Sequence, residues 1–283
     1  MENLVLNSFA KINLSLDVLS KRNDGYHNID TIMQKISLKD ILTFEKIDRK
    51  TCIIESSNKE LETDYRNICY KVYNYFLENY KINAGLKIFI EKHIPISAGL
   101  AGGSSNAACT IKAIDQLFNL KLNKSHMLEI ASKIGSDVAF FLQDKNTLRA
   151  KGRGFCFSDL EDFKIGKVLI VNNGTKISSK DVYDKIKISK ISKIDLSCEA
   201  LKENKNLDRY FYNTMENVSF KIDKDIKRIK EDMLKNGAKV SLMSGSGPTV
   251  FGIFDDEQKL SNAYQHFKDE KYVFICNFGG IDG

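Results

Sequence analysis

A glycine-rich stretch in the first half of the chain contains the residue types that proteins use to bind phosphate. It carries three glycines and ends on two serines. Glycines let the backbone turn its N–H groups inward, and a helix that begins among them presents the positive end of its dipole to an anion. These residue types predict a loop that binds the phosphates of a nucleotide. The stretch comprises Pro95, Ile96, Ser97, Ala98, Gly99, Leu100, Ala101, Gly102, Gly103, Ser104 and Ser105.

We expect this loop to connect a strand to a helix. Before it, apolar and polar side chains alternate over residues 85–91, which predicts a strand. After it, apolar residues recur at helical spacing from Ala107 to Phe118, with Ser104 or Ser105 as the first cap. No lysine follows the glycines, so the loop is not a Walker A element. A tight connection without a ligand is the alternative interpretation.

Two further stretches favour a phosphate-binding function. The first is Ser-Phe-Ala-Lys-Ile-Asn-Leu at residues 8–14, followed by Asp-Gly-Tyr-His at 24–27. The second is Met-Ser-Gly-Ser-Gly-Pro-Thr-Val-Phe at 243–251. With the glycine-rich loop between them, the chain resembles the GHMP kinases, which are named after galactokinase, homoserine kinase, mevalonate kinase and phosphomevalonate kinase. Its first stretch is similar to the branch that phosphorylates the cytidine diphosphate conjugate of methylerythritol.

The resemblance implies an α+β, two-domain GHMP-kinase-like fold with the active site in the cleft between the domains. Residues 1–158 would form an α/β domain like domain 2 of ribosomal protein S5, and residues 159–283 a ferredoxin-like α+β sandwich. The element order that we expect in the second half, with two helices between strands, is typical of such a sandwich. A chain of 283 residues, 42% of them hydrophobic, can form two such cores.

The same resemblance implies transfer of the γ-phosphoryl group of ATP to the 2-hydroxyl of the methylerythritol. It assigns Asp137 as the general base and Lys11 as the cation that keeps Asp137 ionised and stabilises the transferring group. From spacing alone, a helix-terminal or capping aspartate is the favoured interpretation of Asp137, and the match of residues 135–141 to the family reverses it. A lone lysine in a strand is ordinarily a surface residue, but the apolar neighbours of Lys11 indicate an enclosed setting.

Residues that bind ATP and the substrate are also implied by the resemblance. ATP would bind to the glycine-rich loop, with Mg²⁺ bridging its phosphates, no dedicated metal site, and Ser105 as the candidate protein ligand. Tyr26 and His27 would read the cytosine, with Tyr183 on the other side of the stack; packing of Tyr183 on a sheet is the alternative. The remaining candidates are Asn67 on the adenine side, Gly245, Ser246 and Gly247 in the second glycine loop, and Asn13 beside the substrate.

The chain departs from the family pattern at four positions. It has Thr214 where the family has an aspartate, Phe155 where it has a glutamate, Ala101 where it has a glycine, and Ala139 where it has a proline. Neither catalytic candidate is among them, so we expect activity to be retained. The packing around Thr214 is the point that these departures leave open.

Composition argues against several other classes of protein. The net charge of +6 is spread over a chain with 28% charged residues, and the basic run at 185–193 lacks the aromatic residues that stack on bases. No segment approaches the ~18 apolar residues of a membrane helix, and no signal peptide is evident. Six cysteines without metal-type spacing favour free thiols in a reducing compartment. We therefore expect a cytoplasmic protein, monomer or homodimer, with no nucleic-acid or membrane partner.

Two other functions are considered. Another GHMP kinase, acting on homoserine, mevalonate or phosphomevalonate, would share the glycine loops but would not need Asp-Gly-Tyr-His. A non-catalytic nucleotide or sugar-binding protein on the same fold would be expected to have lost Lys11 or Asp137, and this chain has both.

The pattern along the chain also predicts where elements break. We expect a bend at Ala10 and Lys11 in the first strand region and a break at Lys39-Asp40 in the next. A helix is predicted over residues 66–79, another over residues 125–134 that closes at Gly135, and a longer one from about residue 220 to 235.

Overall fold

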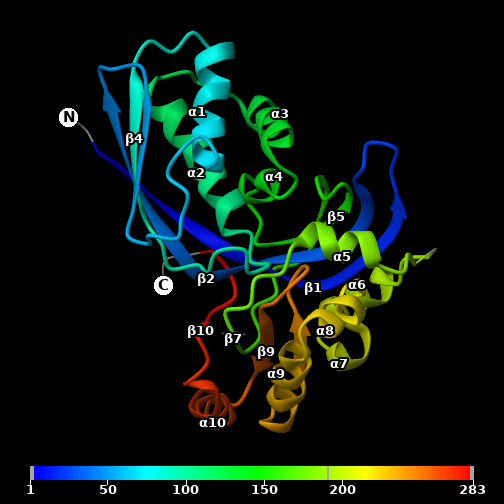
Figure 1. Cartoon of the computed structure of the whole chain (residues 1–283). Helices are drawn as coiled ribbons and strands as arrows, with labels where there is room; N and C mark the ends of the chain where they lie inside the picture. Colours follow the sequence, from blue (N-terminus) through cyan, green and yellow to red (C-terminus); the bar gives the residue numbers. More distant parts are fainter. Residues whose placement is uncertain (1–2, 190, 281–283) are drawn as a thin grey trace. The chain divides into compact units, whose positions relative to one another are not determined.

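The computed structural model describes residues 3–189 and 191–280 (Figure 1). Contacts between residues divide the chain into two compact units built from interleaved segments. Unit 1 comprises the chain up to Ala10, Leu38–Ile96 and Ala101–Asp144. Unit 2 comprises Lys11–Ser37, Ser97–Leu100 and the chain from Lys145 onward. These units follow contacts and not a single cut in the sequence, so the division at residues 158 and 159 stays a prediction.

Two long strands, β1 (Leu4–Lys21) and β2 (His27–Ile47), pair with each other and contribute to both units. Both are continuous, so the predicted break at Lys39-Asp40 is wrong, whereas residues 4–19 form one strand and the bend at Ala10 and Lys11 stays a prediction. The break was inferred from an acidic residue that is typical of turns, whereas Asp40 is buried and accepts hydrogen bonds from another segment of unit 1.

In unit 1, β4 pairs in parallel with β3 and antiparallel with the second half of β2. The bounds of β4 are those predicted, and every second side chain is buried, with Phe89 exposed. Helix α2 begins at the glycine-rich loop and packs against α1 and α4. The elements are β3 (Cys52–Ser56), α1 (Ile68–Asn79), β4 (Gly85–Glu91), α2 (Gly102–Leu117), α3 (Lys124–Ile134) and α4 (Val138–Phe141).

In unit 2, a four-stranded antiparallel sheet has the order β10-β7-β9-β8, which confirms the predicted α+β sandwich. Helices α9 and α10 pack on β9 (Figure 1). The elements are β5 (Thr147–Gly152), β6 (Cys156–Asp159), β7 (Lys167–Asn172), α5 (Ser179–Lys185), α6 (Ile194–Glu203), α7 (Leu207–Tyr210), α8 (Glu216–Ile222), α9 (Lys224–Lys235), β8 (Val240–Met243), β9 (Val250–Phe254), α10 (Glu257–Phe267) and β10 (Tyr272–Cys276).

The core of unit 2 combines the sheet, its helices and the apolar side of β1. Leu16 and Val18 of β1 belong to the same buried cluster as Ile226 and Met233 of α9 and Phe267 of α10. In a strand, alternate side chains point to opposite faces. Because Leu16 and Val18 are buried in this core, Lys11 and Asn13 point to the opposite face of β1.

Two helix predictions need correction. The helix predicted over residues 220–235 is two helices, because the Asp223 side chain accepts from the N–H of Asp225 and begins α9. Ile222 consequently lies outside the buried stripe and is 43% exposed. The helix predicted over residues 66–79 begins at Ile68, because the Asn67 side chain accepts from the N–H of Cys69 and begins α1.

Candidate functional site

The two glycine-rich loops of the sequence contact each other within unit 2. The Ser244 hydroxyl donates to the carbonyl oxygen of Gly99 at 3.0 Å. Gly99 has φ +77°, and a Cβ built there would lie 2.3 Å from the Ser244 carbonyl oxygen. A Cβ built at Gly245 would lie 3.3 Å from the Gly99 carbonyl oxygen and 3.6 Å from Asn13 Oδ1. The sequence thus uses glycine where two backbones approach each other and the polar face of β1.

The first glycine loop enters α2 through an alternating backbone. Ser97, Gly99 and Ala101 all have positive φ, and α2 begins at Gly102 with Ala101 as the residue before it. No side chain caps this end, so the prediction of Ser104 or Ser105 as the cap is wrong; both lie in the first turn. The first N–H groups of a helix have no acceptor inside it, so this turn offers backbone donors to an anion.

Ala101, which stands where the family has a glycine, has the backbone conformation that a glycine favours. Its φ of 55° lies in the left-handed region, where a residue with a Cβ costs roughly 1–2 kcal/mol and glycine does not. The conformation is therefore the one that a glycine would favour at this place. The chain adopts it with alanine, so the departure leaves the start of α2 in place.

A buried ion pair in unit 1 anchors the segment that leads into the loop. Lys92 Nζ lies 2.7 Å from Asp40 Oδ2, and the two side chains are 4% and 0% exposed. Asp40 Oδ1 accepts from the backbone N–H groups of His93 and Ile94, each at 2.8 Å. Burial lowers the pKa of Lys92, and the charge of Asp40 counteracts this effect. The pair fixes the chain one residue before Pro95.

Lys11 is enclosed, as its apolar neighbours predicted. It is 4% exposed, and its Nζ donates to Asn13 Oδ1 at 2.7 Å. The Asn13 amide donates in turn to Thr31 Oγ1 at 2.8 Å, and the Thr31 hydroxyl donates to the Ser15 carbonyl oxygen at 2.6 Å. The backbone N–H of Lys11 donates to the Leu100 carbonyl oxygen, so the first glycine loop and this network are joined.

Asp137 belongs to unit 1 and stands at the residue before α4. It is half-buried, and its side chain makes no capping hydrogen bond. Asp137 is therefore at a helix terminus, as spacing alone favoured, but its side chain does not cap the helix. Lys11 belongs to unit 2. The pairing of Asp137 with Lys11 stays a prediction.

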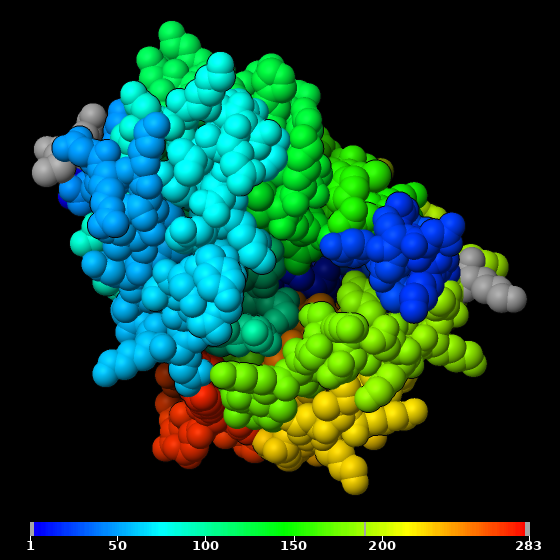
Figure 2. Space-filling model, turned by 45° about the horizontal axis from the view of Figure 1, so that its top comes forward, coloured from blue at the N-terminus to red at the C-terminus, as the bar shows by residue number. Residues whose placement is uncertain are grey.

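The turn between β1 and β2, which carries the substrate candidates Tyr26 and His27, belongs to unit 2; in Figure 2 this part of the chain is blue and lies beside yellow-green residues of the same unit. His27 is 8% exposed and stacks on Tyr183, with ring centroids 4.9 Å apart and planes inclined by 21°. Burial and the charge of Lys21 lower the pKa of His27, which favours the neutral ring. Tyr26 is 50% exposed. Tyr183 thus covers His27, while its stacking on a base stays a prediction.

Asn67 has a structural role in unit 1. Its Oδ1 accepts from the N–H of Cys69 at 2.9 Å as the first cap of α1, and its Nδ2 donates to the Glu62 carbonyl oxygen. Because both polar atoms of the Asn67 side chain are hydrogen-bonded, the side chain holds the segment before α1 in place. Its role on the adenine side stays a prediction.

The second glycine loop accepts hydrogen bonds from, and donates them to, residues 213–216, the segment in which Thr214 stands where the family has an aspartate. Asn213 Nδ2 donates to the carbonyl oxygens of Met243 and Gly245, at 2.7 and 2.8 Å. Glu216 accepts from the N–H of Met243 at 2.9 Å. Thr214 donates its N–H and its hydroxyl to the Leu16 carbonyl oxygen. The motif therefore packs inside unit 2 with threonine in the place of the aspartate.

Sequence reasoning missed Thr31, which belongs to the network of Lys11 and Asn13, and it missed Asp40 and Lys92, which hold the segment just before the first glycine loop. The signal for Asp40 was present, because a charged residue interrupts an otherwise continuous strand pattern. Its partner is more than fifty positions away, so nothing local distinguishes a buried anchor from a turn. For Thr31, the strand pattern indicated a buried face but no partner.

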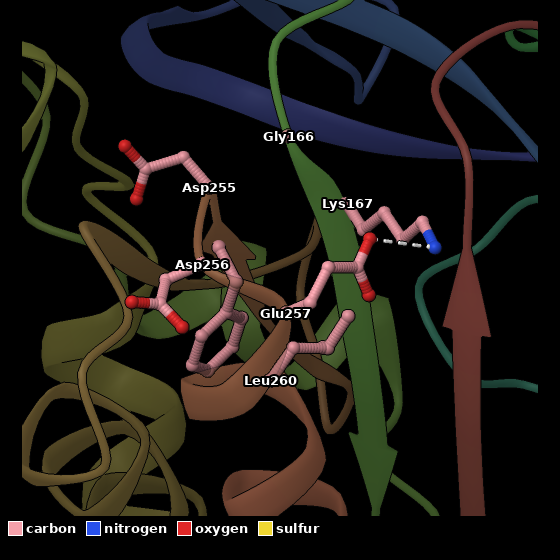
Figure 3. Close-up of a pocket in the computed structure, with 7 residues that line it drawn as sticks. Gly166, Lys167, Asp255, Asp256, Glu257 and Leu260 are labelled. Carbon is pink, nitrogen blue, oxygen red and sulfur yellow. Dashed lines mark ion pairs between the residues drawn. The ribbon is translucent and has the colours of Figure 1, made fainter.

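Other sites are not supported in the part of the chain that the structure describes. Within residues 3–189 and 191–280, no group of three or more His, Cys, Asp or Glu side chains could hold a metal ion, and no helix could span a membrane. A pocket of about 170 Å³ in unit 2 lies between the start of β7, the end of β9 and the start of α10, and three of its seven lining residues are acidic (Figure 3). Its Glu257 pairs with Lys167 at 2.9 Å, its Asp256 caps α10, and its Asp255 pairs with Lys239.

The contact between the two loops gives a testable expectation at Gly99. Gly99→Ala would place a methyl group against the Ser244 carbonyl oxygen at a positive φ, so we expect a loss of more than about 1 kcal/mol in the free energy of unfolding. Gly103→Ala, in the first turn of α2, is the matched control, because the atom nearest to its Cβ position is Ile68 Cγ2 at 3.8 Å. Urea unfolding compares the two variants. Equal stability would contradict the contact.

Comparison with known proteins gives consistent matches. Residues 67–145 match the model "GHMP kinases N terminal domain", and residues 191–273 match "GHMP kinases C terminal". A 4-diphosphocytidyl-2-C-methyl-D-erythritol kinase of Finegoldia magna is 44% identical over 95% of this chain and 97% of its own. One of Caldanaerobacter subterraneus is 42% identical over 99% and 97%.

Solved structures agree with these matches. A crystal structure of 4-(cytidine 5'-diphospho)-2C-methyl-D-erythritol kinase superposes with a TM-score of 0.82 at 26% identity, covering 98% of this chain and all of its own. A homoserine kinase from Cytophaga hutchinsonii superposes with a TM-score of 0.73 at 17% identity, covering 98% and 96%. The second likeness shows the fold alone.

Proposed function

The chain belongs to the 4-diphosphocytidyl-2-C-methyl-D-erythritol kinase family of GHMP kinases, and we propose on this basis that it phosphorylates 4-(cytidine 5'-diphospho)-2-C-methyl-D-erythritol. ATP is the donor, the 2-hydroxyl is the acceptor, and the products are the 2-phosphate and ADP in the non-mevalonate isoprenoid pathway. The observation that carries this proposal is the 44% identity to a kinase of that name over 95% of the chain.

The chemistry requires positioning and neutralisation of charge more than covalent work by the protein. The oxygen of the 2-hydroxyl attacks the γ-phosphorus, the bond from that phosphorus to the β–γ bridging oxygen breaks, and ADP leaves. We assign the hydroxyl proton to the Asp137 carboxylate. Lys11 keeps that carboxylate ionised and stabilises the negative charge of the transferring group. The burial of Lys11 supports its role, since a low-dielectric setting strengthens its field.

ATP is assigned to the two glycine loops, with Asn67 on the adenine side. Backbone N–H groups of the first turn of α2 would bind the phosphates, and Gly245, Ser246 and Gly247 would add donors from the second loop. Mg²⁺ would neutralise phosphate charge. Ser105 is its candidate protein ligand, because its hydroxyl lies in the first turn of α2, and a metal held chiefly by phosphates needs no carboxylate cage.

The substrate is assigned to the polar face of β1 and to the turn after it. Asn13 would hold the methylerythritol, while Tyr26 and His27 would read the cytosine, with Tyr183 behind them. The neutral His27 ring supports this assignment, because it keeps one nitrogen as an acceptor for the amino group of the base.

The broader setting is also part of the proposal. We place the enzyme in the cytoplasm as a monomer or homodimer with a small-molecule substrate and no nucleic-acid or membrane partner. None of the six cysteines, all of which lie in the described residues, forms a disulfide, which suits a reducing compartment. A boundary near residue 159 lies between the two family matches, which supports a two-domain division at that point.

A panel of alcohols tests the substrate. With ATP and Mg²⁺, ADP release is expected to be rapid with the cytidine diphosphate conjugate of methylerythritol and slow with mevalonate, phosphomevalonate and homoserine. The physical reason is that only the first carries a base for Tyr26 and His27. Equal rates with homoserine or mevalonate would exclude this substrate, and ADP release with none of the alcohols would favour a non-catalytic binding protein.

A further inference from the structure

Arg153 projects from a tight turn between β5 and β6 in unit 2. Glycines flank it at positions 152 and 154, with φ of 67° and 99°, and the N–H of Gly154 donates to the Lys151 carbonyl oxygen at 3.1 Å. Residues with a Cβ rarely adopt positive φ, so the two glycines are what allow the backbone to make this turn. The turn therefore presents the arginine side chain in a defined direction.

The guanidinium of Arg153 lies on the ring of Tyr26. Its Cζ is 3.7 Å from the ring centroid, the distance of direct face-on stacking, and 5.7 Å from the ring centroid of Phe155. Its Nε is buried without a hydrogen-bond partner among the residues that the structure describes. Stacking on the aromatic ring, and not a hydrogen bond from Nε, thus holds this part of the arginine.

The backbone of Tyr26 is fixed separately from its ring. Its N–H donates to Asp24 Oδ1 at 3.1 Å, and its carbonyl oxygen accepts from the N–H of Arg22 at 2.8 Å. The ring itself is half exposed, whereas the ring of the neighbouring His27 is buried against Tyr183. A half-exposed ring with a cation on one face has its remaining surface available to a ligand.

We propose that Arg153 is a positioning residue of the pyrimidine subsite, holding the Tyr26 ring from one face so that the other face stacks on the cytosine of the substrate. This inference rests on the proposed function. A stack of guanidinium, ring and base restricts the ring before the substrate arrives, so less freedom is lost on binding. Because Arg153 acts through Tyr26, its effect belongs to recognition of the base and not to the transfer of the phosphoryl group.

Binding of cytidine and of cytidine diphosphate separates this role from direct contact with phosphate. In Arg153→Leu, the affinity measured by titration calorimetry is expected to fall by about 3- to 10-fold for both probes alike. Arg153→Lys, which keeps the charge but loses the planar group, is expected to show a partial loss. Lys151→Leu is the matched control, because it removes an exposed positive charge from the same hairpin, and it should bind both probes like the wild type.

Kinetics and a double variant complete the test. Arg153→Leu should raise the KM for the cytidine diphosphate substrate by the same factor, with kcat and the KM for ATP within about twofold of the wild type. In a Tyr26→Leu background, Arg153→Leu should have no further effect, because the ring through which it acts is gone.

Three outcomes would overturn the inference. They are a loss confined to the diphosphate probe, which would make Arg153 a phosphate ligand, full additivity with Tyr26→Leu, and unchanged binding of cytidine. Failure of the proposed function is recognised separately, because the wild-type protein would then not phosphorylate the cytidine diphosphate conjugate at all.

Discussion

Asp137→Asn is expected to lower kcat by roughly 10²–10⁴-fold while the protein stays folded. The amide keeps the size of the side chain but cannot accept the proton of the 2-hydroxyl. Asp137 makes no capping hydrogen bond to α4, so the substitution removes no helix cap. Single-turnover phosphoryl transfer at saturating ATP, Mg²⁺ and cytidine diphosphate substrate measures the chemical step, and thermal unfolding of the same sample checks the fold.

Lys11→Ala is expected to cost a similar factor, because its charge would stabilise both the carboxylate and the transferring group. The two residues would act on one transition state, so the double variant should lose much less than the product of the single losses. Near wild-type transfer in folded Asp137→Asn would remove the general base from the mechanism. Fully multiplicative losses would show that the two groups act independently.

Asp40→Asn is expected to lower the free energy of unfolding by about 3–5 kcal/mol, because it leaves Lys92 as an unpaired buried cation. The amide oxygen can still accept from the N–H groups of His93 and Ile94, so the loss reports chiefly on the charge. Removing the cation as well, in Asp40→Asn/Lys92→Met, should recover most of the loss. Urea unfolding of the three proteins measures these differences.

The exposed pair of Glu55 and Lys87 on β3 and β4 is the control for this experiment. Its atoms are 3.1 Å apart with both side chains largely in solvent, so Glu55→Gln should cost at most about 1 kcal/mol. If Asp40→Asn cost no more than this control, the buried pair would not anchor the segment before the glycine loop. If it is an anchor, the single Asp40 variant should also show a raised KM for ATP.

Local patterns in the sequence determined several elements of this protein correctly. The alternation in β4 and the helical spacing in α3 gave both elements their observed ends to within one residue. The same reasoning placed Lys11 in an enclosed setting, because its apolar neighbours Ala10 and Ile12 indicated a strand inside the protein, and Lys11 is 4% exposed. These predictions succeed because backbone periodicity and side-chain burial act over a few residues.

Predictions that depended on distant partners failed, and Asp40 is the clearest case. An aspartate inside a strand pattern indicates a turn when only its neighbours are considered. In the folded unit it is buried, because Lys92 and two backbone N–H groups compensate for its charge. The two serines at the start of α2 failed as caps for a local reason, because the helix begins at Gly102 after Ala101 in the left-handed conformation and no side chain caps this end.

The sequence by itself determined that this chain has two glycine loops, a lysine-bearing strand and the residues of a GHMP kinase. Only the tertiary structure decided that Gly99 contacts Ser244, that Tyr183 covers His27, and that Arg153 lies on Tyr26. Each of these contacts joins residues far apart in the chain. Their energies depend on distance and burial in the folded unit, which spacing along the sequence does not specify.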